Sequence, residues 1–229
     1  TEGIESDTSL CQKNTARCIF EYIYFARPDS KIDGMGVYES RINAGRILAK
    51  THPVDADLVV GVPESGNPAA LGFSLESGIP YGNAFIKNNY VGRTFIKPKQ
   101  AQRESSVKVK LNVLKEAVAG KRVVMIDDSI VRGTTSARIV SLLKNSGAKE
   151  VHVRISSPPF KHPCYFGTDI PSEDQLIATG KTVDEICKII GADSLGYLEV
   201  DRLSEMIWGG TCLLYTSPSQ RDMRRSRMP

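Results

Sequence analysis

The chain has 229 residues, of which 41% are hydrophobic and 24% charged, and its formal net charge is +4 at pH 7. These proportions are typical of a soluble protein with one α/β domain and room for a short appendage. No apolar run reaches the roughly 18–20 residues that span a bilayer, and the first twenty residues lack the basic and apolar segments of a secretory signal. We therefore expect a cytoplasmic protein without a membrane partner.

The positive charge is concentrated at the C-terminus. Residues 211–229 hold four arginines against one aspartate, whereas the rest of the chain is close to neutral. A general nucleic-acid-binding surface is therefore not expected, although binding through this tail is an alternative. Because residues 209–229 also lack amphipathic periodicity, the sequence predicts that they are a disordered tail or a sequence artefact outside the fold.

Short apolar runs alternate with helix-like patterns along the chain, which is typical of parallel βαβ units. The sequence predicts strands over Ile19–Phe25, Leu58–Val62, Asn83–Ile86, Val123–Ile126 and Val151–Ile155. It predicts helices over Tyr38–Lys50, Pro68–Glu76, Thr135–Ser146 and Asp201–Trp208. A capping box at Thr182–Glu185 predicts one more helix, which would bury Val183, Ile186 and Ile190.

Residues 88–110 have no clear period and hold six basic residues against the single acidic residue Glu104. A segment of this length without a pattern of its own is either disordered or a functional loop. The plainer alternative is a solvated charge run.

The run VVMIDDSIVRGTTS, residues 123–136, is the main functional signal. A buried strand ends in the adjacent carboxylates Asp127 and Asp128, and a loop with Gly133 and several hydroxyl side chains then opens a helix. Open α/β sheets bind ligands at this edge, and helix N-termini attract anions. The loop therefore suits a phosphate, and the carboxylates suit sugar hydroxyls or hydrated Mg²⁺. The alternative is an ordinary strand–turn–helix with solvated acidic residues.

This run resembles the phosphoribosylpyrophosphate signature of type I phosphoribosyltransferases, and IDDSIVRGTTS is similar to the form found in glutamine phosphoribosylpyrophosphate amidotransferases. The segments EYIYFARPDS, GVPESG, KNNYVGRTFI and ISSPPFKHPC resemble segments of that family in the same order. The resemblance covers residues 18–208. It implies a type I phosphoribosyltransferase fold, a mainly parallel sheet flanked by helices, over residues 12–208.

The resemblance also implies the first reaction of de novo purine synthesis. In that reaction phosphoribosylpyrophosphate and glutamine-derived ammonia give 5-phosphoribosylamine and pyrophosphate, with Mg²⁺ as cofactor. Members of the family are oligomers under nucleotide feedback, and they make ammonia in an N-terminal glutaminase domain that residues 1–17 cannot form. We therefore expect residues 1–11 to be a linker remnant, and any activity of the chain to use free ammonia.

Carried over residue by residue, the resemblance assigns roles within the motifs. The catalytic positions are Asp127, Asp128, Arg93 and Lys97. The substrate-binding positions are Ser65, Gly66, Tyr90, Thr94, Phe95, Ser129, Arg132, Gly133, Thr134, Thr135 and Ser136. Ser65, Asp127 and Asp128 would hold Mg²⁺. The residues from the 88–110 segment would form a lid that closes over the substrate, excludes water and stabilises the charge of the leaving group.

The five cysteines (Cys11, Cys18, Cys164, Cys187 and Cys212) are odd in number and widely scattered, so they do not form a disulfide framework. The resemblance places Cys18 and Cys164 at ligand positions of a [4Fe–4S] cluster in one branch of the family. The CxxC pair that completes that site is missing here, so we expect an incomplete ligand set. The alternative is that both are buried, apolar side chains.

Two rival functions share parts of this pattern. A type I phosphoribosyltransferase that uses orotate or a purine base has the same 123–136 signature but does not need YVGRTFI and HPCYFG. A regulator that binds phosphoribosylpyrophosphate without catalysis has the same fold, but the intact acidic pair and the lid sequence count against it. A requirement for a base, or binding without turnover, would distinguish these rivals.

Overall fold

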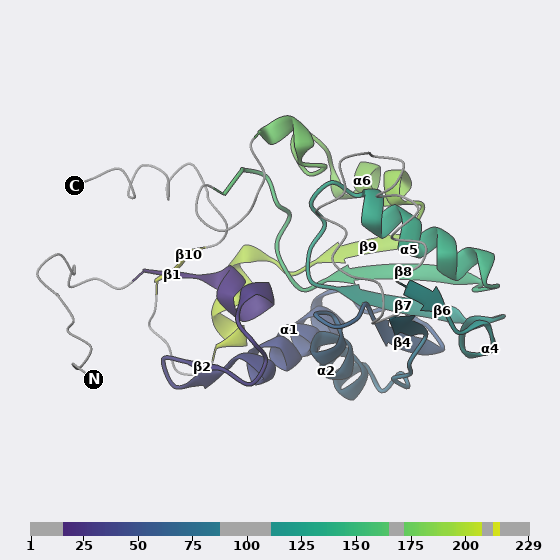
Figure 1. The fold of residues 1–229 in the computed structure, drawn as a ribbon, viewed down its shortest axis with the longest axis horizontal. Helices are drawn as coiled ribbons and strands as arrows, with labels where there is room; N and C mark the ends of the chain where they lie inside the picture. The colour runs from purple at the N-terminus through teal and green to yellow at the C-terminus, as the bar shows by residue number, and fades with distance from the viewer. Residues whose placement is uncertain (1–15, 88–110, 165–171, 208–212, 216–229) are drawn as a thin grey trace, which may run out of the picture.

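The computed structural model describes residues 16–87, 111–164, 172–207 and 213–215 (Figure 1). Its centre is a four-stranded parallel sheet of spatial order β4-β7-β8-β9. The four strands are β4 (Leu58–Gly61), β7 (Arg122–Asp127), β8 (Glu150–Ile155) and β9 (Ser194–Tyr197). Three strand pairs lie outside this sheet: parallel β1 (Ala16–Cys18) with β10 (Leu213–Tyr215), and antiparallel β2 (Lys31–Ile32) with β3 (Met35–Gly36) and β5 (Phe85–Lys87) with β6 (Leu111–Val113).

Helices cover both faces of the central sheet, as expected for parallel strands. The α-helices are α1 (Val37–Thr51), α2 (Asn67–Ser77), α4 (Lys115–Val118), α5 (Thr134–Asn145) and α6 (Val183–Ile190). The other helical segments are the π-helix η1 (Glu21–Phe25) and the 3₁₀-helices η3 (Glu173–Gln175) and η4 (Val200–Met206). Figure 1 shows α1 and α2 on one face and α5 and α6 on the other.

Alternate residues of β7 enter two separate hydrophobic cores. Val124 and Ile126 belong to the core that contains the apolar residues of α1 and α2, whereas Val123 and Met125 belong to the core of α5 and α6. This is the period-two alternation of a strand that is buried on both faces. Asp127 is the last residue of β7, and Asp128 follows it outside the strand.

Helices α1 and α2 pack backbone against backbone. A Cβ atom built on Gly45 would lie 1.8 Å from the Ala69 carbonyl oxygen, and one on Gly72 would lie 1.9 Å from that of Ile42. Only glycine fits at these two positions. The contact therefore fixes the start of α2, and with it the loop that follows β4.

Most of the predicted elements are confirmed, with boundaries that differ by at most two residues. The predicted strand over Ile19–Phe25 is wrong, because this segment begins with helical turns and continues as η1. Ile19, Tyr22 and Ile23 are buried, which is a helical spacing. Phe20 packs edge-on against Phe160, with 5.4 Å between ring centroids. Aromatic and β-branched composition alone did not distinguish the two structures.

Two further expectations need correction. Val183 is 39% exposed although Ile186 and Ile190 are buried, because Val183 lies in the first turn of α6, away from the buried stripe. The last helix is the 3₁₀-helix η4 rather than an α-helix over Asp201–Trp208, and Trp208 lies outside the described residues. Within the predicted tail, Leu213–Tyr215 form β10 alongside β1, and the prediction for the other residues of 209–229 stays a prediction.

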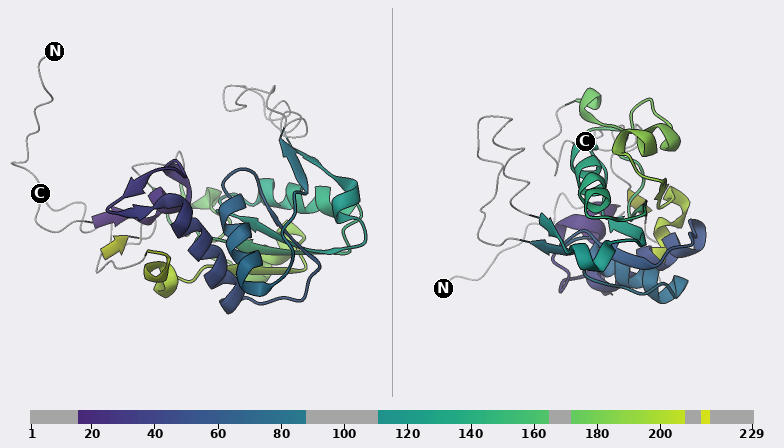
Figure 2. Two further views of the ribbon diagram at one scale, coloured as in Figure 1. Left: turned by 90° about the horizontal axis from the view of Figure 1, so that it is seen from below. Right: turned by 90° about the vertical axis from the view of Figure 1, so that its right-hand side faces the viewer.

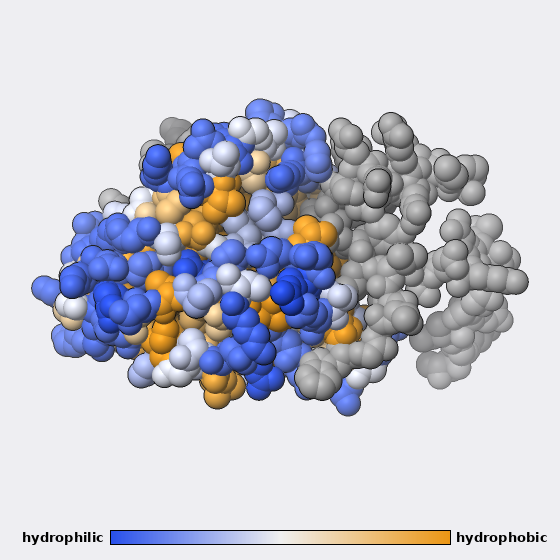
Figure 3. Space-filling model, turned by 180° about the vertical axis from the view of Figure 1, so that it is seen from behind, coloured by the Kyte–Doolittle hydropathy of each residue, from blue (hydrophilic) through white to orange (hydrophobic). Residues whose placement is uncertain are grey.

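On the face shown in Figure 3, the described residues are mainly hydrophilic, with apolar residues between the charged ones. Within the part of the chain that the structure describes, no helix is long and apolar enough to cross a membrane. Figure 2 shows β5 and β6 as a two-stranded ribbon that projects from the body of the domain. In this ribbon Lys87 pairs with Leu111, so the two ends of the 88–110 segment lie next to each other.

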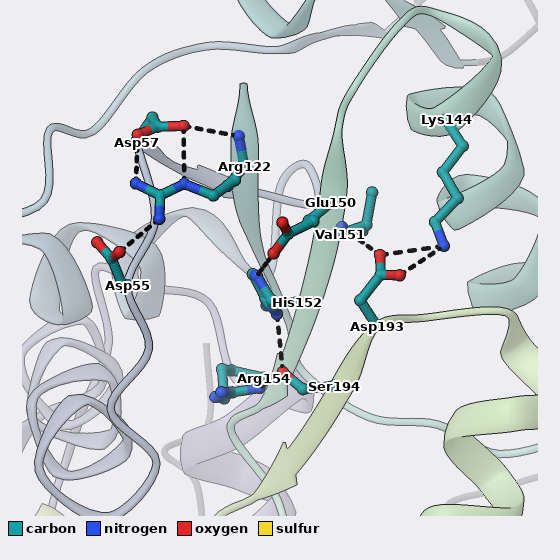
Figure 4. Close-up of polar contacts among 10 residues, drawn as sticks. All are labelled: Asp55, Asp57, Arg122, Lys144, Glu150, Val151, His152, Arg154, Asp193 and Ser194. Carbon is teal, nitrogen blue, oxygen red and sulfur yellow. Dashed lines mark hydrogen bonds and ion pairs between the residues drawn. The ribbon is translucent and has the colours of Figure 1, made fainter. Parts of the chain in front are cut away.

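Ion pairs and polar contacts lie along the strands and at their amino ends (Figure 4). Arg122, the first residue of β7, binds both Asp55 and Asp57, and these contacts hold the pKa of Asp57 at about 2. On β8, His152 contacts Glu150 at 3.1 Å and the Ser194 hydroxyl at 3.0 Å. These contacts tie β4 to β7 and β8 to β9.

Candidate active site

Strands β4 and β7 end side by side, and each is followed by a loop that opens a helix. Their register pairs Gly61 with Ile126. The Val62 N–H donates to the Ile126 carbonyl oxygen at 2.8 Å, and a Cβ atom on Gly66 would lie only 2.4 Å from that oxygen. The peptide bond between Pro63 and Glu64 is cis. The hydrogen bond from Val62 and the close approach of Gly66 hold the loop after β4 directly against the end of β7.

Asp127 and Asp128 are buried at this edge, with only 8% and 7% of their surface exposed. The Asp128 N–H donates to Asp127 Oδ1 at 2.9 Å, and the Ser129 hydroxyl donates to Asp128 Oδ1 at 2.5 Å. Ser65, from the loop after β4, also forms a side-chain hydrogen bond with Asp128. The structure thus brings together the acidic pair and two hydroxyls that the sequence assigned to one site.

Burial raises the pKa of both carboxyl groups, because water no longer solvates their charged forms. For Asp127 the pKa lies well above its ordinary value, and the charge of Asp128 raises it further. For Asp128, hydrogen bonds from Ser129 and Ser65 and the positive charge of Arg41 oppose the rise. A cation at this edge would relieve the desolvation and the repulsion together.

The loop after β7 leads into α5 through Gly133. Gly133 has φ 78°, a backbone conformation that favours glycine, and a Cβ atom there would also displace the end of the Ile177 side chain, whose Cδ1 lies 2.4 Å away. Thr134 and Thr135 are exposed in the first turn of α5, where free N–H groups and the helix dipole favour an anion. Ser136 is buried, so its hydroxyl is less open to a ligand than those of the two threonines.

The segment that contains η3 packs against this loop, which the sequence did not reveal. The Ile177 N–H donates to the Val131 carbonyl oxygen at 2.9 Å, and Arg132 donates to the Gln175 side chain at 2.5 Å. Arg132, assigned to the substrate, therefore already has a protein partner. No periodicity marks residues 172–178, so their role depends on tertiary contacts alone.

Arg41 is a second residue that the sequence prediction missed. It is 4% exposed and lies on α1 among the buried residues Val37, Ala44 and Leu48, at the i−4, i+3 and i+7 positions. A charged residue on the apolar stripe of a helix is the signal that could have identified it. Its charge acts on Asp128 across the core.

Five residues assigned to the lid, Tyr90, Arg93, Thr94, Phe95 and Lys97, lie outside the described residues. Their roles therefore stay predictions. The antiparallel pairing of Lys87 with Leu111 shows only where the segment that contains them leaves and rejoins the fold.

The carboxyl groups of Asp127 and Asp128, together with the Ser65 hydroxyl, suit Mg²⁺. This ion commonly takes one or two protein carboxylates and completes its shell with water and substrate phosphates.

The cysteine thiols do not form a comparable metal site. Desolvation raises the pKa of the Cys18 thiol, and the nearby Cys164 raises it further; Cys18 is exposed at the surface and Cys164 is partly buried. The described residues contain no group of three or more cysteine, histidine or acidic side chains suited to a metal. Two thiols do not fit a four-thiolate cluster.

A hollow of about 300 Å³ adjoins the loop after β4 on its α1 and α2 side. Its lining includes Glu64, Asn67, Tyr38 and Tyr81, but neither of the two carboxylates. The acidic pair is therefore part of the sheet edge and does not lie at the bottom of this hollow.

The chain matches the family model described as phosphoribosyl transferase domain over residues 41–157, about half of its length. The chain belongs to this phosphoribosyl transferase family. The matched range contains β4, β7 and both loops described above. The predicted fold, a type I phosphoribosyltransferase with a mainly parallel sheet flanked by helices, is confirmed.

Relatives of this family member are named amidophosphoribosyltransferase. That of Archaeoglobus fulgidus is 59% identical over 192 residues, which cover 84% of this chain and 42% of the relative. That of Bacillus subtilis is 53% identical over 202 residues, which cover 88% of this chain and 42% of the relative. The solved structure of glutamine phosphoribosylpyrophosphate amidotransferase from B. subtilis, complexed with ADP and GMP, superimposes with a TM-score of 0.78 at 52% identity, covering 86% of this chain and 44% of that one. This chain thus spans less than half the length of those relatives.

Proposed function

We propose that the protein catalyses the phosphoribosyl transfer of amidophosphoribosyltransferases, the first step of de novo purine synthesis. Its substrates are 5-phosphoribosyl-1-pyrophosphate and ammonia, and its products are 5-phosphoribosylamine and pyrophosphate. The observation that carries the proposal is the buried pair Asp127 and Asp128, between the glycine loop after β4 and the hydroxyl-rich start of α5. Identity above 50% to amidophosphoribosyltransferases across this site supports the choice within the family.

Each part of the substrate has a matching part of the site. The 5-phosphate binds Ser129 to Ser136, where the N–H groups of α5 and the threonine hydroxyls donate hydrogen bonds. The ribose hydroxyls bind Asp127 and Asp128, whose oxygens accept. The pyrophosphate lies along Ser65 and Gly66, at the start of α2.

Transfer breaks the bond between ribose C1 and the pyrophosphate oxygen, and the electron pair leaves with pyrophosphate. The nitrogen lone pair of ammonia forms the new bond to C1, and the nitrogen then loses a proton. Mg²⁺, held by Asp127, Asp128 and Ser65, would neutralise charge on the leaving group. Arg93 and Lys97 would add positive charge at the same place, while Tyr90, Thr94 and Phe95 would help to exclude water.

The nitrogen source and the regulation belong to the same proposal. In the intact enzyme, glutamine would supply the ammonia, and purine nucleotides would act as feedback inhibitors of an oligomer. The B. subtilis structure that contains ADP and GMP supports the nucleotide part. The ligand set at Cys18 and Cys164 does not fit a four-thiolate cluster, and the proposal assigns no step to one.

The test is pyrophosphate release from phosphoribosylpyrophosphate with Mg²⁺ and a high concentration of ammonium, with the Asp127→Asn/Asp128→Asn double variant as control. We expect release that depends on ammonium and is lost in the folded double variant. Parallel assays replace ammonium with orotate, adenine or guanine. Release only with a base would replace the proposal by a base-using transferase, and substrate binding without any release would replace it by a regulator.

A further inference from the structure

Residues 172–179, which contain η3 and are called the η3 segment below, contribute to both hydrophobic cores. Leu176 belongs to the core that contains the apolar residues of α1 and α2, whereas Ile177 belongs to the core of α5 and α6. Both side chains are buried. The segment is also tied to the chain that follows β8, because the Thr179 hydroxyl donates to the Lys161 carbonyl oxygen at 3.1 Å. These contacts fix the position of the η3 segment in the domain.

The η3 segment packs against the loop after β7 through Ile177. The Ile177 N–H donates to the Val131 carbonyl oxygen at 2.9 Å. A Cβ atom on Gly133 would lie 2.4 Å from Ile177 Cδ1, so the Ile177 side chain lies directly over this glycine. The backbone and the side chain of one buried residue thus contact the loop on both sides of Arg132.

Gln175 forms a second contact with the same loop. Arg132 Nη2 donates to Gln175 Oε1 at 2.5 Å, and Gln175 is half-buried. Among the described residues, this bond and the bond from Ile177 are the hydrogen bonds that join loop residues 129–133 to another segment of the chain. The η3 segment is therefore the hydrogen-bonded support of this loop.

A loop that binds an anion through its N–H groups binds it best when its conformation is set beforehand, because ordering the loop on binding costs free energy. We propose that Gln175 and Ile177 are positioning residues for the 5-phosphate: they hold the loop after β7 in the conformation that binds this phosphate. The inference rests on the proposed function of the site. Neither residue touches the substrate, and both act through the loop.

A purely structural role is the competing explanation, because a buried isoleucine stabilises the fold wherever it lies. Such a role would lower stability without selecting between ligands. The positioning role predicts selectivity, because a ligand with a 5-phosphate uses the loop after β7, whereas pyrophosphate uses the loop after β4. A substitution that loosens the first loop should therefore weaken binding of the first kind of ligand alone.

The experiment compares Gln175→Leu and Ile177→Ala with the wild-type chain. Asp174→Leu is the matched control for Gln175→Leu, since Asp174 is the exposed neighbour of Gln175 in η3. Ile190→Ala is the matched control for Ile177→Ala, because Ile190 is buried in the same core but ends α6 and lies outside the η3 segment. NMR titrations with ribose 5-phosphate, and separately with pyrophosphate and Mg²⁺, measure the two affinities. Urea denaturation measures the stability of each protein.

We expect the dissociation constant for ribose 5-phosphate to rise roughly threefold or more in Gln175→Leu and Ile177→Ala, an effect of the size expected for loss of one hydrogen bond. The dissociation constant for pyrophosphate should change by less than about twofold, as for sites that do not share contacts. Both controls should bind ribose 5-phosphate as the wild-type chain does, although Ile190→Ala should lower stability as Ile177→Ala does.

Unchanged or tighter binding of ribose 5-phosphate in Gln175→Leu would overturn the inference, and tighter binding would mean that Gln175 competes with the substrate for Arg132. The result for Gln175→Leu decides the question if Ile177→Ala does not fold. An equal loss of affinity for both ligands, or the same loss in Ile190→Ala, would also overturn it and leave Ile177 as a core residue. If the wild-type chain does not bind ribose 5-phosphate, the proposed function fails and the inference fails with it.

Discussion

The ionisable side chains at the two ends of β7 lie in opposite kinds of surroundings. At its start, half-buried Arg122 pairs with Asp55 and Asp57, and this pairing holds the pKa of Asp57 at about 2 (Figure 4). At its end, Asp127 and Asp128 are buried beside each other, and burial raises the pKa of both. Strand β7 thus begins at a group of opposite charges and leads, at its carboxyl end, into two buried acidic side chains.

The difference separates stability from function. Opposite charges in water cost little to bring together, and they contribute modestly to the fold. Like charges without water are unfavourable until a ligand supplies the compensating charge. Without a ligand, the buried acidic pair has an unfavourable electrostatic free energy. A bound cation and the hydroxyl groups of a sugar would lower that free energy, so we expect ligand binding to be most favourable at the carboxyl edge of the sheet.

The largest effect is expected from single substitution of the acidic pair. Asp128→Asn should lower ammonium-dependent pyrophosphate release by about 100-fold or more, because removal of one preorganised charge commonly costs 10²–10³ in rate. Steady-state kinetics with saturating ammonium measures this loss. A folded Asp128→Asn variant with nearly wild-type turnover would mean that the carboxyl edge is not where the chemistry takes place.

Gly66→Ala should have the next largest effect. The new methyl group would lie 2.4 Å from the Ile126 carbonyl oxygen, so the loop must move away from β7 and the free energy of unfolding should fall by about 2 kcal/mol. Urea denaturation measures the change. Gly36→Ala is the matched control, because the atom nearest to its new methyl group is 3.9 Å away, and its cost should stay below about 1 kcal/mol. Equal costs in the two variants would contradict the tight contact between the loops.

Asp127→Asn should stabilise the ligand-free protein by about 1 kcal/mol at pH 8, since an amide oxygen can accept the same N–H bond without a buried charge. A carboxyl group with a raised pKa destabilises the fold above that pKa and not below its unfolded value near 4. The stability gap between variant and wild type should therefore shrink as the pH is lowered from 8 toward 4. Chemical denaturation at several pH values measures the gap, and a gap that widens on acidification would be contrary to a raised pKa.

The smallest effect is expected at the amino end of β7, where Asp57→Asn should slightly lower the melting temperature at pH 7. Here the sign of the pH dependence is reversed. The folded pKa of about 2 lies below the ordinary value, so the stabilisation is complete above about pH 4 and is lost as the pH falls toward 2. Melting curves of variant and wild type should then converge in acid. Curves that stay apart below pH 3 would show that Asp57 acts through something other than its charge.

The sequence predicted the strand, loop and helix at the β7 end of the candidate site, because several local signals agree there. An apolar strand, two carboxylates, a glycine and three hydroxyls follow in one uninterrupted run, and the structure keeps them together. Placing Ser65 and Gly66 at the same edge of the sheet required only that β4 and β7 be parallel neighbours. These features depend on short-range pattern and on one rule of sheet architecture.

What the sequence did not reveal depends on contacts between distant segments. Ile19–Phe25 has the composition of a strand, but packing on α1 and on Phe160 makes it helical. Arg41 was passed over because a charge on a helix is usually solvated, and only the assembled core shows it to be buried. The contacts of Gln175 and Ile177 with the loop after β7 leave no local pattern at all.

The ribbon of β5 and β6 determines how freely the length and sequence of residues 88–110 can change. Because Lys87 and Leu111 are cross-strand neighbours, the fold already closes the chain on both sides of residues 88–110. The entropy of closing a loop grows only slowly with its length, so insertions or deletions between those two residues should affect folding little. Evolution or protein engineering could then replace the whole segment by one of different length and chemistry while the sheet, the acidic pair and the phosphate loop keep their places.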